Sequence, residues 1–193
     1  MSEAKHYNSC AVFGKVVGDI EKKTSDGGVL YISFSVAVSG RKSGSARAFC
    51  KMWKEERIAP FLAALGKNPE AAFYFRGFFS QYWDPQNTVY SNFVCFDWEI
   101  RDSEPRAAFI LKGLVEVAHQ VNSGQRLLLT VKREGQPAER FELWCQAEKL
   151  LDEPAADSLV EVKGYLRQET PEDEFGGSTG PVRAYVEQLR ILS

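Results

Sequence analysis

Apolar and polar positions alternate strictly in the first half of the chain. Between residues 30 and 38, five apolar side chains alternate with small or polar ones, which is the period of a strand with one buried face. Between residues 55 and 65 the apolar spacing widens to three or four, which predicts a short helix. The other strands predicted in this half cover residues 9–17, 48–53, 73–83 and 93–100. Five strands with a helix between the third and fourth are the order of an OB barrel.

The second half repeats this order in shorter form. Trp53 and Trp144 each end a predicted third strand, and Gly77 and Gly164 each lie within a predicted fourth strand. We take these as corresponding positions of a duplicated unit. The strands of this half are predicted at residues 109–118, 125–133, 139–145, 158–167 and 182–192, with a helical stretch near 147–151. We therefore predict an all-β chain with short helices, folded as two tandem five-stranded OB-fold Greek-key barrels.

A polar breaker at residues 102–106 marks the predicted joint between the halves. It divides the chain into an N-terminal OB domain over residues 1–104 and a divergent C-terminal OB domain over residues 105–193. The first part carries 13 Lys and Arg against 12 Asp and Glu, and the second carries 11 against 14. The first domain is therefore the better partner for an anion.

Strand parity in residues 48–53 yields the strongest candidate for a binding surface. Side chains alternate between the two faces of a strand, so Phe49, Lys51 and Trp53 share one face. Aromatic rings can stack on any nucleobase, and the ammonium group attracts phosphate. The alternative is that Trp53 packs beneath the following helix and Phe49 plugs the mouth of the barrel.

The predicted fourth strand extends this candidate surface. Arg76 lies on the face opposite the three phenylalanines at positions 73, 75 and 79, and Tyr82 and Trp83 stand at the base of the loop over residues 84–92. A Trp83 ring folded back onto the barrel is the alternative to a ring that grips a base. The hairpin tip at residues 40–45 adds two further candidate cations, Arg41 and Lys42.

In the second half, the outward rows supply Trp144 and Lys163 as candidates for binding nucleic acid, but they also carry Glu142 and Glu161. Carboxylates at such positions repel phosphate. The tip at residues 168–181 is acidic, which is typical of a solvated loop, although it could also compete with DNA or contact a partner.

Motifs for catalysis, cofactors and metals are missing from the sequence. It contains no phosphate-binding loop, dinucleotide fingerprint, nucleophile elbow or zinc-protease motif, so we predict neither an enzyme nor a cofactor. The four cysteines are far apart and only two histidines are present, which disfavours a metal site and favours buried thiols. With no secretory signal and no apolar run long enough for a membrane span, we expect a soluble, cytoplasmic protein.

The first half resembles the bacterial single-stranded DNA-binding proteins (SSB). Asn8, Gly14, Asp19 and Glu21 match that family's first strand and turn in order, and the match continues as far as residue 100. It also includes the Asp-Gly-Gly turn at 26–28, the alternating run at 33–38, the helix that follows Trp53, and Gly77 followed by Trp83.

The resemblance implies that Trp53 and Trp83 occupy base-stacking positions. The family's other two tryptophans would fall near residues 39–41 and near Arg47, with Phe49 as a possible substitute for the second. Proteins of this family usually carry a glycine-rich tail with an acidic tip, and we expect no such tail here, although the internal acidic stretch at residues 171–175 could imitate it. A second barrel stands in its place, as in SSB proteins that carry two OB folds and dimerise.

We therefore expect non-catalytic, largely sequence-independent binding and protection of single-stranded DNA in replication, recombination or repair. The expected assembly is a homodimer, with replication or recombination proteins as further candidate partners. The main alternative is an SSB-like paralogue that serves as a dimerisation or protein-interaction module, such as a primosomal accessory protein. RNA binding is a third hypothesis, because nothing in the sequence identifies a reader of the 2′-hydroxyl.

Overall fold

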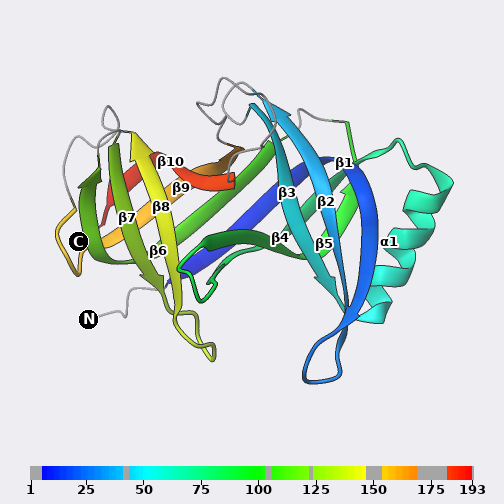
Figure 1. Ribbon diagram of the computed structural model, residues 1–193, viewed down its shortest axis with the longest axis horizontal. Helices are drawn as coiled ribbons and strands as arrows, with labels where there is room; N and C mark the ends of the chain where they lie inside the picture. Colours follow the sequence, from blue (N-terminus) through cyan, green and yellow to red (C-terminus); the bar gives the residue numbers. More distant parts are fainter. Residues whose placement is uncertain are drawn as a thin grey trace.

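A computed structural model describes residues 6–40, 44–102, 106–121, 124–146, 154–168 and 182–192 (Figure 1). The elements in chain order are β1 (Tyr7–Thr24), β2 (Leu30–Gly40), β3 (Gly44–Trp53), α1 (Glu55–Lys67), β4 (Ala72–Trp83), β5 (Val89–Ile100), β6 (Arg106–Val121), β7 (Gly124–Val131), β8 (Glu139–Gln146), β9 (Leu159–Gln168) and β10 (Val182–Ile191). The predicted helix near 147–151, the centre of the joint at 103–105, the two cations Arg41 and Lys42, and nearly all of the acidic tip lie outside the described residues.

The strands close into two barrels with the same connectivity. The first runs β1-β2-β3-β5-β4 and closes by pairing β4 with β1, and the second runs β6-β7-β8-β10-β9 and closes by pairing β9 with β6. The ladders within each barrel are antiparallel except β3–β5 and β8–β10, which are parallel. The predicted pair of five-stranded OB-type barrels is confirmed, with α1 on the outer side of the first barrel (Figure 1).

The two barrels are joined along the antiparallel pair β1–β6, where Cys10 lies opposite Phe109. Their cores meet at Phe79, whose ring stacks on Phe109 with 4.5 Å between centroids and lies 5.6 Å from Phe141. All three phenylalanines are fully buried within one continuous hydrophobic core. Strand pairing and shared packing therefore hold the barrels together.

Two side-chain amides extend this junction where backbone pairing stops. Asn8 donates to the carbonyl oxygen of Phe79 at 2.7 Å and accepts from the Phe79 N–H at 3.0 Å. Gln81 of the first barrel does the same for Glu142 of the second, donating to its carbonyl oxygen at 3.0 Å and accepting from its N–H at 2.6 Å. Each amide replaces a neighbouring strand and satisfies buried backbone groups that would otherwise lack partners.

Several element boundaries differ from the predictions. β3 begins at Gly44 and not at residue 48, and β6 covers Arg106–Val121 and not only 109–118. β1 continues past residue 18 to Thr24, because a bulge between Val17 and Glu21, with Gly18 at φ +71°, bends the strand while it keeps pairing with β2. The loop after β4 is shorter than predicted, since β5 already begins at Val89. The helix α1 continues through Gly66 to Lys67.

Pairing registers correct the predicted correspondence between the barrels. A Cβ on Gly14 would meet the Ala37 oxygen at 2.0 Å, and one on Gly113 would meet the Thr130 oxygen at 2.3 Å, so these glycines mark equivalent strand crossings. From these crossings, Ala37 pairs with residue 47 and Thr130 pairs with residue 140. Residues 47 and 140 are therefore equivalent, and four residues further along each strand, Lys51 is equivalent to Trp144. The predicted match of Trp53 with Trp144 is therefore wrong by two residues.

The error arose because Trp53 ends its strand, whereas Trp144 does not. β8 continues two residues beyond Trp144, and its last residue, Gln146, is the counterpart of Trp53. A shift of two residues keeps the side chain on the same face, so alternation alone could not detect it. The predicted match of Gly77 with Gly164 agrees with the register, because a Cβ on either would strike the carbonyl oxygen of a corresponding residue, Val94 or Tyr185.

The four cysteines are buried free thiols, as predicted. Burial raises the pKa of Cys145 to about 12 and raises the pKa values of Cys10 and Cys50 well above their ordinary value. A thiol that stays protonated is a poor nucleophile and a poor metal ligand. In the part of the chain that the structure describes, no helix has the length and apolar character needed to cross a membrane.

Candidate nucleic-acid interface

The outer face of β2 and β3 presents aromatic and cationic side chains in alternation. Ala48, Cys50 and Met52 are buried, whereas Phe49 is 50% exposed, and Lys51 and Trp53 are partly exposed. Parity thus places the three candidate residues of β3 on the solvent side of the barrel. On β2 they are faced by Tyr31, Ser33 and Ser35, which are opposite Trp53, Lys51 and Phe49 respectively.

Tyr31 and Trp53 form the first aromatic pair of this face. The two residues are direct cross-strand neighbours, and their ring centroids lie 4.4 Å apart at an interplanar angle of 29°. Trp53 therefore does not pack beneath α1 but stands on a second ring. Sequence analysis did not single out Tyr31, although its outward position was visible in the alternation of residues 30–38.

Tyr82 and Tyr90 form the second pair, at the end of the β4–β5 hairpin. They are opposite each other in the ladder, with centroids 5.0 Å apart and an interplanar angle of 13°. Both remain open to solvent, at 49% and 43% exposure. Sequence analysis missed Tyr90 because it lay within the predicted loop over residues 84–92. An aromatic residue in that loop was the one sign that it could belong to the binding surface.

Asp84 organises the hairpin turn beneath this second pair. Its carboxylate accepts hydrogen bonds from the Gln86 and Thr88 N–H groups at 2.9 and 2.8 Å, and from the Tyr90 hydroxyl at 3.3 Å. The negative charge of Asp84 raises the pKa of Tyr90, so the hydroxyl stays protonated and keeps donating. The turn thereby orients the Tyr90 ring against Tyr82.

Lys51 links the two aromatic pairs. Its Nζ atom lies 6.0 Å from the centroid of Tyr31 and 5.7 Å from that of Tyr82, which is the outer range of a cation–π contact. We call this set the aromatic row; it consists of Tyr31, Phe49, Lys51, Trp53, Tyr82 and Tyr90. The row combines exposed π faces with a positive charge at its centre.

A polar groove runs beside the aromatic row. Arg47, Phe49 and Lys51 line one part of it, and Asp19 and Glu21 line another. Glu21 forms an ion pair with Lys23 at 2.6 Å and accepts a hydrogen bond from Ser33 at 3.3 Å. The bond from Lys23, followed by the charge of Lys23, lowers the pKa of Glu21, so this carboxylate stays ionised and is already engaged.

The structure does not bring all the predicted residues to this row. Arg76 is six residues from Tyr82 along β4, about 20 Å away, and it forms an ion pair with Asp97. Trp83 is partly buried and follows Tyr82 directly, so its side chain points to the opposite face of the hairpin, the face of Gln81. Arg41 and Lys42 lie outside the described residues.

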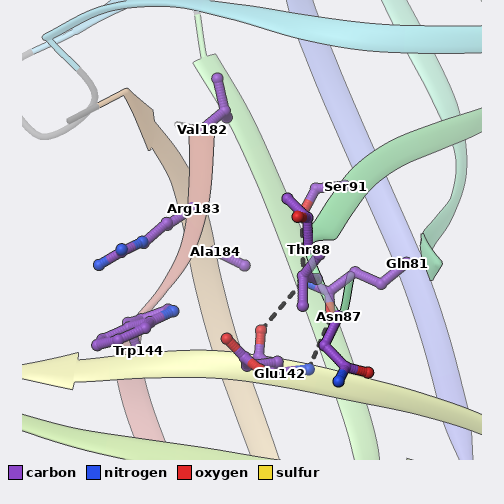
Figure 2. Close-up of a pocket in the computed structure, with 10 residues that line it drawn as sticks. Gln81, Asn87, Thr88, Ser91, Glu142, Trp144, Val182, Arg183 and Ala184 are labelled. Carbon is purple, nitrogen blue, oxygen red and sulfur yellow. Dashed lines mark hydrogen bonds between the residues drawn. The ribbon is translucent and has the colours of Figure 1, made fainter. Parts of the chain in front are cut away.

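Trp144 and Lys163, the two candidates in the second barrel, are separated as well. Trp144 lines a groove between the β4–β5 hairpin and strands β8 and β10 (Figure 2), and the guanidinium carbon of Arg183 lies 4.1 Å from its ring centroid. Lys163 is exposed on β9, where it pairs with Ile110 of β6. The two side chains therefore stand on different strands and contribute to different surfaces.

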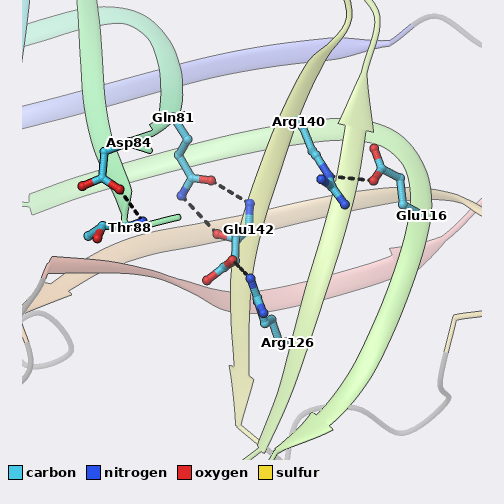
Figure 3. A network of polar contacts seen from close by, with 7 residues as sticks. All are labelled: Gln81, Asp84, Thr88, Glu116, Arg126, Arg140 and Glu142. Atoms are coloured by element: carbon cyan, nitrogen blue, oxygen red, sulfur yellow. Dashed lines mark hydrogen bonds and ion pairs between the residues drawn. The ribbon is translucent and has the colours of Figure 1, made fainter. Parts of the chain in front are cut away.

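The face of the second barrel that corresponds to the aromatic row is occupied by ion pairs (Figure 3). Register places Glu142 where the first barrel has Phe49, and Arg126 where it has Ser33. These two residues bind each other, and Arg140 binds Glu116 at 2.7 Å. The cations of this face are therefore neutralised within the chain, whereas Lys51 of the first barrel contacts aromatic rings.

Comparison with known proteins connects this fold to a class of structures. No protein-family model and no curated protein matches the sequence. Among solved structures, the chain is similar to the wild-type single-stranded DNA binding protein from Thermus aquaticus, with a TM-score of 0.67 and 13% identity over 98% of this chain and 95% of that one. A deletion mutant of the same Thermus protein matches with a TM-score of 0.64 and 14% identity, over 97% of this chain and 95% of that one. At this level of identity, the likeness shows a shared fold across both barrels.

Proposed function

We propose that this chain binds single-stranded DNA without catalysis and with little sequence preference, and that the aromatic row of the first barrel is its main platform. The observation that carries the proposal is Lys51 held between two stacked aromatic pairs on an exposed face. Fold similarity to a single-stranded DNA binding protein supports it. The biological role that fits is protection of strands exposed during replication, recombination or repair.

Binding in this proposal combines stacking with phosphate neutralisation. Every base has a π face, so exposed rings accept bases regardless of sequence and contribute roughly 1 to 3 kcal/mol per base. Because Trp53 and Tyr82 each rest on a second ring, they are already ordered, and little side-chain entropy is lost when a base stacks on them. Lys51 stands between the two stacking positions, where the phosphate chain that joins two bases would pass.

The site assignment is tested by titrating labelled dT oligonucleotides with the variant Trp53→Ala/Tyr82→Ala. We expect the loss of two stacking rings to weaken binding by about 2 to 6 kcal/mol. The matched control is Ile100→Ala, which removes another exposed apolar side chain at the far end of β5 from Tyr90. Wild-type affinity in the double variant would refute the assignment, and equal loss in the control would show a general effect on folding.

A homodimer is the assembly that we propose for the protein. Its support is a hollow on the outer side of the sheet at the β1–β6 seam, which is lined by Tyr7, Phe96, Ala108 and Ile110. Tyr7 and Phe96 are 50% and 39% exposed, and clustered exposed apolar residues usually mark an interaction surface. Light scattering of the wild type and of Phe96→Glu tests this: the wild type should have twice the mass of the chain and the variant should be monomeric.

The interaction-module hypothesis makes the opposite prediction for DNA. If the barrels serve only assembly or docking, saturating DNA should leave the tryptophan fluorescence unchanged, whereas stacking on the row should quench Trp53. Competition between dT and rU oligonucleotides of equal length separates DNA from RNA binding. An RNA-binding protein would prefer the rU competitor.

A further inference from the structure

A groove of about 230 Å³ separates the β4–β5 hairpin of the first barrel from β8 and β10 of the second. Thr88 and Ser91 line it from the hairpin, and Trp144 and Arg183 line it from the second barrel (Figure 2). The two bonds between Gln81 and the backbone of Glu142 span the two sides, so the hairpin is held against β8. The groove is therefore a formed feature of the fold rather than a gap between independent loops.

Trp144 and Arg183 together offer a stacking platform with a charge attached. Arg183 lies over the Trp144 ring at 4.1 Å, and both side chains border the open space of the groove. An aromatic ring accepts a nucleobase, and a guanidinium group binds phosphate and also stacks on flat rings. Among the described residues that line the groove, the one carboxylate is that of Glu142, and it is bound to Arg126.

The groove lies on the other side of the same hairpin that carries part of the aromatic row. Tyr82 points to the row, and its neighbour Gln81 points to Glu142 and the groove. Trp144 follows Glu142 by two residues, about 7 Å along β8. A strand that leaves the row over Tyr82 and Tyr90 would thus reach Trp144 after crossing a single hairpin.

The ion pairs of the second barrel explain why the strand would bind at Trp144 and not at its neighbours. Trp144 lies on the face that corresponds to the aromatic row, and on that face Glu142 and Arg140 are held in the ion pairs Arg126–Glu142 and Arg140–Glu116. In the register of β8, Trp144 stands at the position of Lys51, and its ring borders the β4–β5 hairpin.

We infer that this groove is a second base-binding subsite: a nucleobase of a strand already bound on the aromatic row stacks on Trp144, and a neighbouring phosphate contacts Arg183. This inference rests on the proposed function, because the subsite receives only strands long enough to extend from the row. It assigns the second barrel a length-dependent contribution to DNA binding.

The test is a series of labelled dT oligonucleotides from about 5 to about 30 nucleotides, which brackets the roughly 4 to 16 nucleotides bound per OB fold. For Trp144→Ala we expect affinity within about twofold of wild type for the shortest oligonucleotide and a loss of about tenfold for the longest. Trp144→Phe, which keeps a stacking ring, should recover most of the loss. Thermal melting of each variant verifies that it is folded.

Two outcomes would overturn the subsite. One is wild-type affinity of Trp144→Ala at every length, and the other is an equal loss at every length, since only a length-dependent loss separates a second contact from a general effect. Trp53→Ala is measured in parallel and should weaken binding at all lengths. If Trp53→Ala has no effect, the proposed platform fails, and that result is distinct from a failure of Trp144→Ala.

Discussion

Replacement of Lys51 by glutamine separates the electrostatic part of binding from stacking. The side chain stands at the centre of the aromatic row, and its Nζ atom lies within 6.0 Å of the ring centroids of Tyr31 and Tyr82. Glutamine keeps much of the chain length but removes the charge. Each phosphate neutralised on a single strand contributes about 0.7 to the slope of log affinity against log salt concentration. We therefore expect the slope to become shallower by about 0.7 in Lys51→Gln.

The size of this effect decides how it should be measured. Over a fourfold rise in salt concentration, a slope change of about 0.7 alters the ratio of wild-type to variant affinity by about 2.5-fold. Fluorescence anisotropy of labelled dT at several salt concentrations resolves such a change. Trp53→Ala should behave differently, with weaker binding at all salt concentrations and an unchanged slope, because it removes a neutral ring.

The control for Lys51→Gln is Lys132→Gln, which removes the same charge from an exposed position just after β7 in the second barrel. It should leave the salt slope within error of the wild type. A Lys51→Gln slope equal to that of the wild type, with affinity lowered by one factor at all salt concentrations, would refute phosphate contact by Lys51. The loss would then reflect disturbed rings.

Three further predictions concern the fold. Gly164→Ala should destabilise the protein by about 1 to 3 kcal/mol, because its Cβ would lie 2.2 Å from the Phe109 ring and 2.5 Å from the Tyr185 oxygen. The control is Gly27→Ala, where the nearest contact of the new Cβ would be 3.9 Å away. Urea unfolding compares the free energies of unfolding of the two variants. Phe79→Ala should cost about 3 to 5 kcal/mol, since the ring packs in both barrels. Calorimetry should still show one transition, because the β1–β6 pairing continues to join the barrels; two separated transitions in the variant would contradict this. At pH 8, Cys10, Cys50 and Cys145 should resist a thiol reagent in the folded protein and react on unfolding. Burial raises the pKa values of all three, that of Cys145 to about 12, so little thiolate forms at pH 8. Rapid labelling of these three cysteines in the native state would count against it.

The alternation of apolar and polar residues along the chain was enough to predict most of the fold and the centre of the candidate site. A period of two follows directly from strand geometry, so alternation alone located the strands and put Phe49, Lys51 and Trp53 on one face. The structure has these side chains on the outside of β3, with the residues between them buried. Such statements depend only on neighbouring residues and are therefore accessible without tertiary contacts.

The sequence pattern could not predict which residues of different strands lie opposite each other. Tyr31 meets Trp53, and Tyr82 meets Tyr90, because of the register in which separate strands are hydrogen-bonded. The same register shows that Trp144 corresponds to Lys51 and not to Trp53. Periodicity cannot distinguish registers that differ by two residues, since both leave the side chain on the same face.

The sequence by itself therefore determined the class of fold, the order of its strands and the outward direction of the central candidate residues. Tertiary structure decided which rings form pairs, that Arg76 is ion-paired to Asp97 far from the row and Trp83 points away from it, and that Gln81 binds a hairpin of one barrel to β8 of the other. The physical reason is that the direction of a side chain follows from its own backbone. Its neighbours depend on hydrogen bonds between strands and on packing between barrels, which involve residues far apart in the chain.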